Sequence, residues 1–350
     1  MDLSFYKGKT VLITGHTGFK GSWLSKILLM SGAKVIGYSL ESPTNPNLFS
    51  YLKLEEQMVS IIGDIRDLKK LNEVFDRYQP EIVFHLAAQP IVRESYKDPV
   101  YTYDTNVMGT VNICECVRNH KCVKSFLNVT TDKVYENNDI PDHPFKEDEK
   151  LDGYDPYSNS KSCSEIITHS YFKCFLKDMN IPTSTARAGN VIGGGDFSKD
   201  RIIPDAARAY QSNGELVIRN PQSTRPYQHV LEPLACYLLI AKEQYFNHDL
   251  CGAYNIGPDS CDFSTTQNLV ELFAKYFNGD FKYRIENDGG PHEAAFLSLD
   301  NNKMKKAFKW SPKTHIKNAV FMSAEWYEAW KNNGDLVSIT EKQIKEFFNE

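Results

Sequence analysis

Residues 10–21 read TVLITGHTGFKG, and the fold of the chain can be argued outward from this stretch. The VLI run at residues 11–13 is apolar and rich in β-branched side chains, which is typical of a strand buried on both faces. It ends in a G-x-x-G-x-x-G spacing that begins at Gly15. Apolar residues then recur at helical spacing over 23–31. The glycines are therefore predicted to lie where a first strand turns into a first helix.

A strand, a glycine turn and a helix N-terminus together make a cradle for a pyrophosphate. Glycines let the backbone approach the ligand, while free amide groups and the helix dipole favour its negative charge. The alternative is that Gly15, Gly18 and Gly21 form only a tight turn. Because a strand and a helix flank the glycines, the pattern favours a dinucleotide site.

Length and charge narrow the class of protein. A chain of 350 residues predicts one large domain with a smaller one appended. The net charge of −5 and the absence of basic runs argue against nucleic acid or a membrane surface as partner. No apolar stretch approaches the roughly 18 residues that a membrane span requires, and MDLSFYKGK lacks the apolar core of a signal peptide. We expect a cytoplasmic protein.

The eight cysteines form no C-x-x-C pair, and several lie in apolar helical patterns. This favours reduced cysteines that serve in packing, and we expect no metal site.

Strand and helix alternate after the glycine turn. Residues 34–38, 58–62 and 81–86 are predicted as strands, and residues 68–78 as a helix. This rhythm predicts an α/β fold, a doubly wound parallel sheet with right-handed crossovers and helices on both faces.

The end of the second strand bears on the choice of cofactor. Dinucleotide folds usually place an acid there, about 20 residues past the glycines, but the segment reads Tyr38-Ser39-Leu40-Glu41. Glu41 comes late in the chain, and no arginine stands beside it to accept a 2′-phosphate, so NAD is favoured over NADP. Asp64, directly after the third strand, is placed to reach the adenine end; its alternative role is to cap the helix near Asp67.

Two further segments carry apolar stripes at helical spacing, and we expect both helices to pack on the sheet. The semi-apolar opposite sides leave room for a helix-to-helix contact between two copies, although an ordinary core would satisfy the pattern equally. The stripes are Val100, Tyr103, Val107, Val111, Cys114 and Val117, and Cys163, Ile166, Ser170, Tyr171 and Cys174.

Chemistry is expected after a fifth strand at residues 124–129. That strand delivers Thr131 to its carboxyl end, where open α/β sheets bind ligands. Tyr157 and Lys161 share a helix face, so the ammonium can stabilise the phenolate as a base. Such a base, with the Thr131 hydroxyl alongside, suits removal of a sugar hydroxyl proton while a hydride leaves for a nicotinamide. The spacing alone is common among surface side chains, but its place after the fifth strand favours the base.

On these residues the chain resembles the extended short-chain dehydrogenases/reductases, and within them the CDP-glucose 4,6-dehydratases. The resemblance implies a Rossmann-type NAD-binding domain over 1–190, with returning segments from the second half. It also implies a smaller mixed α/β domain over 191–350 that binds the sugar nucleotide. The matching stretches are TGHTGFKGSWLS (14–25), HLAAQPIVRESY (85–96), TTDKVYEN (130–137), GYDPYSNSK (153–161), RAGNVIGGGDF (187–197), RPYQHV (225–230) and PHEAAFLSLD (291–300).

The implied reaction is the dehydration of a nucleotide-activated hexose with an internally recycled NAD. Tyr157 takes the C4 hydroxyl proton, Thr131 holds the C4 oxygen, and Asp132 is the general acid for the departing C6 hydroxyl. The dTDP-glucose dehydratases place Glu after that Asp as the base at C5, whereas this chain has Lys133. Lysine serves as a base only if its pKa is lowered, so the alternative role of Lys133 is a phosphate or ribose contact.

The pattern and the resemblance together assign two sets of contacts. Arginines of the second set match a diphosphate by charge and fork geometry, although Arg201 could instead pair with Asp205, and His229 could be an ordinary interior histidine. His292 is a weaker candidate for the same pocket. The cofactor set is Gly15, His16, Thr17, Gly18, Phe19, Gly21, Ser39, Asp64, Ile65, Leu86, Ala87, Ala88, Tyr157 and Lys161. The sugar-nucleotide set is Gln89, Asn190, Arg201, Arg225, His229 and Asn255.

Two other functions stay open at this stage. A nucleotide-sugar 4-epimerase or 4-dehydrogenase, acting on another NDP- or GDP-sugar such as GDP-heptose, would keep Thr131, Tyr157 and Lys161 without needing the Asp132 acid. A non-catalytic dinucleotide sensor would need the glycine turn but no base. The family also implies a homodimer, with a tetramer as the alternative, and a deoxysugar for a bacterial surface polysaccharide.

Overall fold

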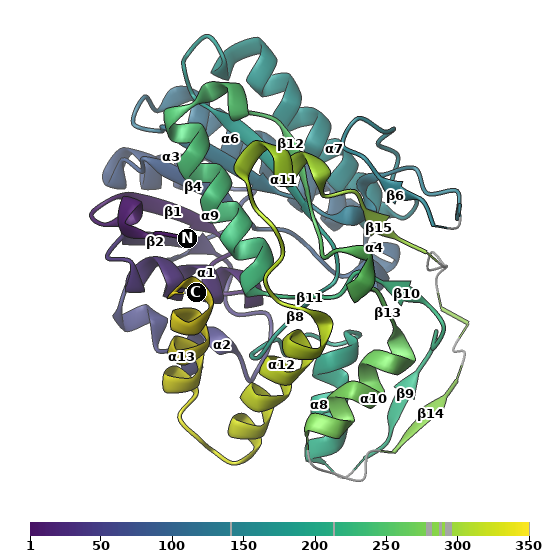
Figure 1. Cartoon of the computed structure of the whole chain (residues 1–350). Coiled ribbons are helices and arrows are strands. Elements are labelled where there is room, and N and C mark those ends of the chain that lie inside the picture. Colours follow the sequence, from purple (N-terminus) through teal and green to yellow (C-terminus); the bar gives the residue numbers. More distant parts are fainter. Residues whose placement is uncertain (141, 213, 278–281, 287–288, 291–295, 350) are drawn as a thin grey trace.

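The centre of the molecule is a seven-stranded sheet in which every neighbouring pair of strands is parallel (Figure 1). The computed structural model describes residues 1–140, 142–212, 214–277, 282–286, 289–290 and 296–349. The strand order is β12-β7-β5-β4-β1-β2-β3, which confirms the predicted doubly wound sheet. Its strands are β1 (Thr10–Thr14), β2 (Lys34–Ser39), β3 (Val59–Ile62), β4 (Ile82–His85), β5 (Ser125–Val129), β7 (Thr183–Ala188) and β12 (Ala253–Ile256).

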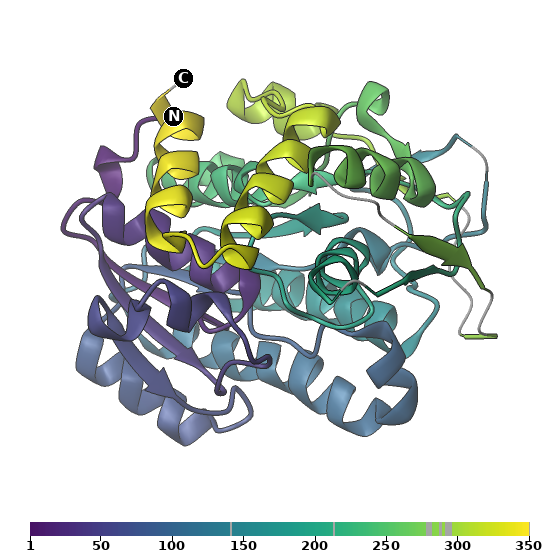
Figure 2. The same cartoon turned by 90° about the horizontal axis from the view of Figure 1, so that it is seen from below.

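Helices cover both faces of this sheet. Side chains of β1 alternate between the two layers: Val11 and Ile13 join one apolar core, and Leu12 joins the other. Figure 2 shows the C-terminal helices (yellow) and the helices near residues 70–120 (blue) on opposite sides. The helices are α1 (Phe19–Met30), α2 (Leu48–Tyr51), α3 (Leu68–Tyr78), α4 (Val92–Lys97), α5 (Pro99–Tyr103), α6 (Gly109–Asn119), α7 (Pro156–Tyr171), α8 (Ile202–Gln211), α9 (Leu231–Phe246), α10 (Thr266–Tyr276), α11 (Asn302–Phe308), α12 (Ile316–Lys331) and α13 (Leu336–Asn349).

The second half of the chain returns to the main sheet through β12, which pairs with β7, and otherwise builds short two-stranded sheets. Within the described ranges, no helix is long and apolar enough to cross a membrane. The short strands are β6 (Pro144–Phe145), β8 (Val191–Ile192), β9 (Leu216–Ile218), β10 (Thr224–Arg225), β11 (Gln228–His229), β13 (Ser264–Thr265), β14 (Tyr283–Ile285) and β15 (Ser298–Leu299).

Both helices pack on the sheet as predicted, through α6 in an apolar core and through α7 by hydrogen bonds to β5, but the predicted apolar stripes are not the faces that do so. On α7 the stripe faces outward, with Ile166 54% exposed, and Val100 at the start of α5 is 78% exposed. Only the last two members of the first stripe, Cys114 and Val117, are buried. The buried face of α7 is instead mostly polar, namely Tyr157, Ser158, Ser160, Lys161, Ser162, Ser164, Glu165 and Thr168.

Hydrogen bonds explain why a polar face can be buried there. The Asn128 amide on β5 donates to both Ser164 and Thr168. Glu165 pairs with Arg187 on β7 at 3.0 Å, with both side chains 3% exposed, and its carboxylate also accepts from Thr185. Because buried polar groups are tolerated when they are bonded, α7 is held to the sheet by polar contacts.

We predict that Glu165→Gln lowers the free energy of unfolding by about 3–5 kcal/mol, because it leaves the Arg187 guanidinium buried without its counter-charge. Glu136→Gln is the matched control, since Glu136 pairs with Lys150 on the surface and should cost less than about 1 kcal/mol. Urea unfolding measures both changes. Equal stability of the two variants would contradict the importance of the buried pair.

Candidate active site

A large cavity lies at the carboxyl ends of β1, β4 and β5, where the strand order reverses between β1 and β4. Its volume is about 1790 Å³, beyond the roughly 300–1,000 Å³ of a typical small-molecule site, so it can hold two ligands side by side. Of the predicted site residues, all but three line it: Gly15, Thr17, Gly18, Phe19, Gly21, Ser39, Asp64, Ile65, Leu86, Ala87, Ala88, Gln89, Thr131, Asp132, Lys133, Tyr157, Lys161, Asn190, Arg201 and Arg225.

The glycine turn has no room for side chains. Gly15 has a φ of +77°, and a Cβ on it would lie 2.8 Å from the Ala87 nitrogen. A Cβ on Gly21 would lie 2.1 Å from the Gly15 carbonyl oxygen. Gly18 is the N-cap of α1, and no side chain caps that helix. The backbone is therefore bare where β1 turns into α1, and the first-turn amides remain available to an anion.

These features fit a dinucleotide. The uncapped N-terminus of α1 accepts a pyrophosphate, and the cavity continues from there to the ends of β2 and β3 on one side and of β5 on the other. Such an elongated ligand bound across the point where strand order reverses is the usual arrangement in open parallel sheets.

His16 is a correction to the predicted cofactor set, because it is fully buried and does not line the cavity. Its two ring nitrogens lie 3.0 Å from the Ser39 hydroxyl and 2.7 Å from the Ser60 hydroxyl. Burial lowers the pKa of His16 to about 4, so the imidazole is neutral. It links the glycine turn to β2 and β3, and its ring fills the space that Gly37 leaves open.

The end of β2 carries hydroxyl groups in place of an acid. Thr17 and Ser39 lie 2.9 Å apart through their side-chain oxygens. Asp64 lines the cavity, but its carboxylate also accepts hydrogen bonds from Arg66, which lower the pKa of Asp64. The alternative that Asp64 caps the helix near Asp67 is wrong, because Asp67 itself caps α3 by accepting from the Lys70 amide.

The segment after β4 borders the middle of the cavity, and hydrogen bonds from buried side chains fix its conformation. The Thr14 hydroxyl accepts hydrogen bonds from the amides of Leu86 and Ala87. The Gln89 side chain accepts from the Ile91 amide at 2.6 Å and donates to the Thr102 hydroxyl at 2.9 Å. Gln89 therefore lines the cavity while its amide group is engaged in shaping the turn.

The residues after β5 form a compact polar group. Asp132 is fully buried, and its Oδ1 accepts from the Thr131 hydroxyl at 2.9 Å and from Lys133 Nζ at 3.0 Å. Its Oδ2 has no hydrogen-bond partner among the residues that the structure describes. A buried carboxylate oxygen without a partner is rare in folded proteins, and a hydrogen-bond donor on a bound ligand would satisfy it.

Tyr157 and Lys161 lie beside this group, both largely buried. Burial raises the pKa of Tyr157 to about 12, opposed by a hydrogen bond with Thr131 and by the charge of Arg201. Burial lowers the pKa of Lys161 to about 8, and its ammonium donates to the Val129 carbonyl at 3.2 Å. Lys161 is thus anchored to β5, and in the ligand-free site the Tyr157 phenol is protonated at neutral pH.

The far wall of the cavity carries the predicted sugar-nucleotide residues. Arg201 pairs with Asp196 at 3.4 Å, not with Asp205, which pairs with Arg208. Arg225 is 7% exposed and donates to the Thr224 carbonyl. Asn190 also lines the cavity, and its buried Oδ1 has no hydrogen-bond partner among the described residues.

His229 and Asn255 are also corrections, since both are fully buried away from the cavity lining. His229 lies edge-on to Trp23 at 6.0 Å, and burial lowers its pKa to about 3. The Asn255 side chain accepts from the Tyr135 hydroxyl at 2.6 Å and donates to the Phe145 carbonyl. Both are interior packing residues. His292 lies outside the described residues.

Sequence reasoning missed six cationic residues that line the cavity: Lys20, Arg93, Lys97, Lys199, Arg208 and Arg219. Lys20 immediately precedes Gly21 within the motif itself, and Arg93 lies in one of the matching stretches. Arg219 pairs with Asp200 at 2.7 Å. No spacing rule predicts these positions. For Lys20 alone, its place at the start of the helix after the glycine turn could have indicated a residue near the bound pyrophosphate.

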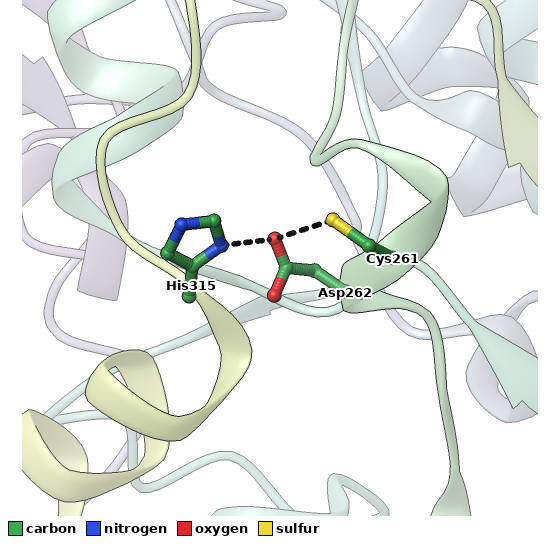
Figure 3. Close-up of side chains that lie close together, drawn as sticks. All are labelled: Cys261, Asp262 and His315. Carbon is green, nitrogen blue, oxygen red and sulfur yellow. Dashed lines mark hydrogen bonds and ion pairs between the residues drawn. The ribbon is translucent and has the colours of Figure 1, made fainter.

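Cys261, Asp262 and His315 lie together outside the cavity, with their side chains pointing toward one another (Figure 3). The Asp262 carboxylate accepts from His315 Nδ1 and from the Ile316 amide, each at 2.9 Å. Ile316 begins α12, so Asp262 holds the start of that helix. Helix capping accounts for this arrangement.

Comparison with known proteins places this site in a family. The model of the GDP-mannose 4,6-dehydratase family matches residues 12–322. The CDP-glucose 4,6-dehydratase of Salmonella typhimurium is 41% identical, and the match covers 100% of this chain and 99% of that protein. Protein CapI of Staphylococcus aureus is 32% identical over 91% of this chain and 98% of its own.

Solved structures agree on the fold. The dTDP-glucose 4,6-dehydratase of Bacillus anthracis in complex with NAD superposes with a TM-score of 0.76 at 22% identity, covering 94% of this chain and 100% of the other. A UDP-glucose 4-epimerase from Stenotrophomonas maltophila with bound NAD reaches 0.80 at 18% identity, over 93% and 100% of the two chains. With its sheet, glycine turn and polar group after β5 all within the matched region, the chain belongs to the GDP-mannose 4,6-dehydratase family of sugar-nucleotide enzymes.

Proposed function

We propose that this chain is an NAD-dependent hydro-lyase that converts CDP-glucose to CDP-4-keto-6-deoxyglucose. The observation that carries the proposal is the meeting of Thr131, Asp132 and Lys133 with Tyr157 and Lys161 in one cavity. The whole-length similarity to a CDP-glucose 4,6-dehydratase supports the choice of reaction and nucleotide.

Bound NAD would supply hydride acceptance at sugar C4 and hydride return at C6. The glycine turn and the amides at the start of α1 would hold its pyrophosphate, and Thr17, Ser39 and Asp64 border the space for its adenosine end. Ser39 at the end of β2 and Thr17 of the glycine turn bring no positive charge for a 2′-phosphate, which supports NAD over NADP.

Proton removal at the C4 hydroxyl falls to Tyr157. A phenol with a pKa near 12 is a poor base at neutral pH, so it needs positive charge nearby when the ligands are bound. The charge of Arg201 lowers the pKa of Tyr157, and so does the hydrogen bond between Thr131 and the phenolic oxygen. We assign Lys161 to holding this arrangement against β5 through the Val129 carbonyl.

Elimination of water falls to Asp132 and Lys133. As an ion pair these groups are a carboxylate and an ammonium, 3.0 Å apart. Transfer of one proton across that contact gives a carboxylic acid and a neutral amine. The amine can then take the C5 proton while the acid protonates the C6 hydroxyl, which leaves as water. The step ends with the ammonium and the carboxylate restored, so the pair returns to its starting state.

The sugar nucleotide is placed by the far wall. Arg201 and Arg225 suit a diphosphate by charge and geometry, and Asn190 offers an amide to the sugar or its phosphates. We assign these three residues, with Gln89 shaping the adjacent turn, to substrate binding. The eight cysteines are free thiols, which supports a cytoplasmic location for the reaction.

A panel of nucleotide-activated hexoses tests the function. The purified protein with added NAD should convert CDP-glucose to a product lighter by one water, over many turnovers for each cofactor molecule. Product mass is measured for CDP-, dTDP-, UDP- and GDP-sugars, GDP-heptose included. A product of unchanged mass identifies an epimerase, and one that has lost two hydrogens identifies a 4-dehydrogenase; either outcome replaces the proposal.

Asp132→Asn tests the elimination. It keeps the shape of the side chain but cannot donate a proton to the leaving hydroxyl, so water loss should slow by roughly 10²–10⁴-fold. A substrate with fluoride in place of the C6 hydroxyl needs less protonation and should recover much of the rate. Tyr157→Phe is the matched control, because it blocks the first step and should recover with neither substrate. Water loss by Asp132→Asn at nearly the wild-type rate would remove Asp132 as the acid.

The outward face of α7 and the 99–119 helical segment supports a homodimer. Ile166, Val100 and Met108 are 54%, 78% and 47% exposed, an unusual amount of apolar surface for neighbouring helices. Tyr103 reaches across to Asn159 on α7 at 3.0 Å, so the two helices form one surface. A second copy of the same surface would bury both, as two-fold symmetry requires.

We predict that Ile166→Asp converts the dimer into a monomer, because it places a charge in the apolar contact. Phe246→Asp is the control, since Phe246 is 68% exposed on α9, outside the proposed interface. Light scattering at micromolar concentration measures the mass. A monomeric wild-type protein, or a dimer that survives Ile166→Asp, would rule out this interface.

A further inference from the structure

Several cationic side chains lie close together in the catalytic cavity. The positive charges of Arg201, Lys161 and Lys133 all act on Lys20, and the Asp132 carboxylate acts on Lys20 in the opposite sense. Lys133 forms an ion pair with Asp132, and Arg201 forms one with Asp196. The Lys161 ammonium donates a hydrogen bond to the Val129 carbonyl. Since like charges in a partly enclosed space repel, a bound anion stabilises this arrangement.

Lys20 differs from the other three cations. No hydrogen bond or ion pair involves its ammonium in the part of the chain that the structure describes; its contact is with the face of the Tyr237 ring, 5.9 Å from Nζ to the ring centre. The side chain lines the cavity. It is the second residue of α1, directly beyond the uncapped glycine turn.

We propose that Lys20 is a diphosphate-binding residue, whose ammonium pairs with a diphosphate lying between it and Arg201. The proposal deepens the proposed function, on which it rests for the ligands. Two diphosphates could fill that place, the pyrophosphate of the dinucleotide or that of the sugar nucleotide. Lys20 lies close to the glycine turn proposed to hold the dinucleotide pyrophosphate. Arg201 lies on the wall assigned to the sugar nucleotide.

Binding is then coupled to a proton. Burial, together with the charges of Arg201, Lys161 and Lys133, lowers the pKa of Lys20 to about 7, so the amine is largely neutral in the ligand-free site above that pH. A diphosphate favours the charged form and raises this pKa. Between the lower and the raised pKa, binding takes up a proton, so affinity falls as pH increases through that window.

The charged and titratable groups that face Lys20 do not remove this pH range of proton uptake. Asp132 and Lys133 come from the segment after β5, Lys161 from α7, Arg201 from the residue before α8, and Tyr237 from α9. Arg201 stays charged, and burial keeps the pKa of Tyr237 far above the working range. Lys161, with a pKa of about 8, titrates nearby, so the proton must be assigned by substitution of Lys20 itself.

The test is calorimetric titration of the full-length protein with NAD, ADP-ribose and CDP at several pH values. Each is run in two buffers of different ionisation enthalpy, which counts the protons taken up. We expect uptake of a fraction of a proton by the wild type near pH 8. Lys20→Met should abolish the Lys20-dependent uptake and weaken binding by roughly 10- to 100-fold at low pH. Lys69→Met is the matched control, because Lys69 is the second residue of α3 and is exposed.

The ligands separate the two sources of diphosphate. An effect on NAD and ADP-ribose but not on CDP assigns Lys20 to the cofactor, and the reverse assigns it to the sugar nucleotide. Lys20→Arg, which keeps the charge but does not titrate, should bind without the Lys20-dependent proton and shows that loss of binding in Lys20→Met is not loss of the fold. Unchanged affinity and proton uptake for all three ligands in Lys20→Met overturns the proposal, as does failure of the wild type to bind any of them.

This outcome is independent of the dehydration assay. A protein that binds a diphosphate through Lys20 but removes no water from any hexose keeps the inference and loses the proposed function. If Lys20→Met dehydrates CDP-glucose and binds all three ligands as well as the wild type does, the proposed function stands and the inference about Lys20 is overturned.

Discussion

The site depends on the close approach of the glycine turn to the end of β4. Gly15 stands so near Ala87 that any side chain would collide with its backbone. The Thr14 hydroxyl holds the two strands' ends together, because it accepts hydrogen bonds from the amides of Leu86 and Ala87. Since β1 and β4 are the strands between which the strand order reverses, this contact fixes the floor of the cavity and aims α1 at the ligand.

The wall of the cavity formed by α7 is held to the sheet by polar contacts and not by an apolar interface. Helix α7 gives its polar face to the sheet, through Glu165 with Arg187 and through Asn128 with Ser164, and this orientation brings Tyr157 and Lys161 to the cavity. Its apolar stripe is left outside and supplies the surface proposed for a second copy. One rotation of the helix therefore accounts for both the catalytic residues and the proposed dimer.

The fold was accessible to sequence reasoning, but side-chain directions were less so. An apolar stripe was expected to face the core, and on α7 that expectation failed because buried polar groups with good partners compete with apolar burial. His16, His229 and Asn255 sit in the right segments and yet face the interior. Lys20 lines the cavity although it stands between the glycines of the motif, whose spacing carries no information about its side chain. A one-dimensional pattern places a residue on an element, whereas neighbouring elements decide which way its side chain turns.

The sequence by itself determined the strand and helix alternation, the glycine turn after β1, and the delivery of Thr131, Asp132 and Lys133 to the end of β5, because these follow from local periodicity and from the geometry of parallel sheets. Only the tertiary structure decided that Asp132 pairs with Lys133, that Lys161 is anchored to Val129, and that Arg201 stands near Lys20. The physical reason is that charge balance and burial depend on contacts between residues far apart in the chain, which no local pattern records.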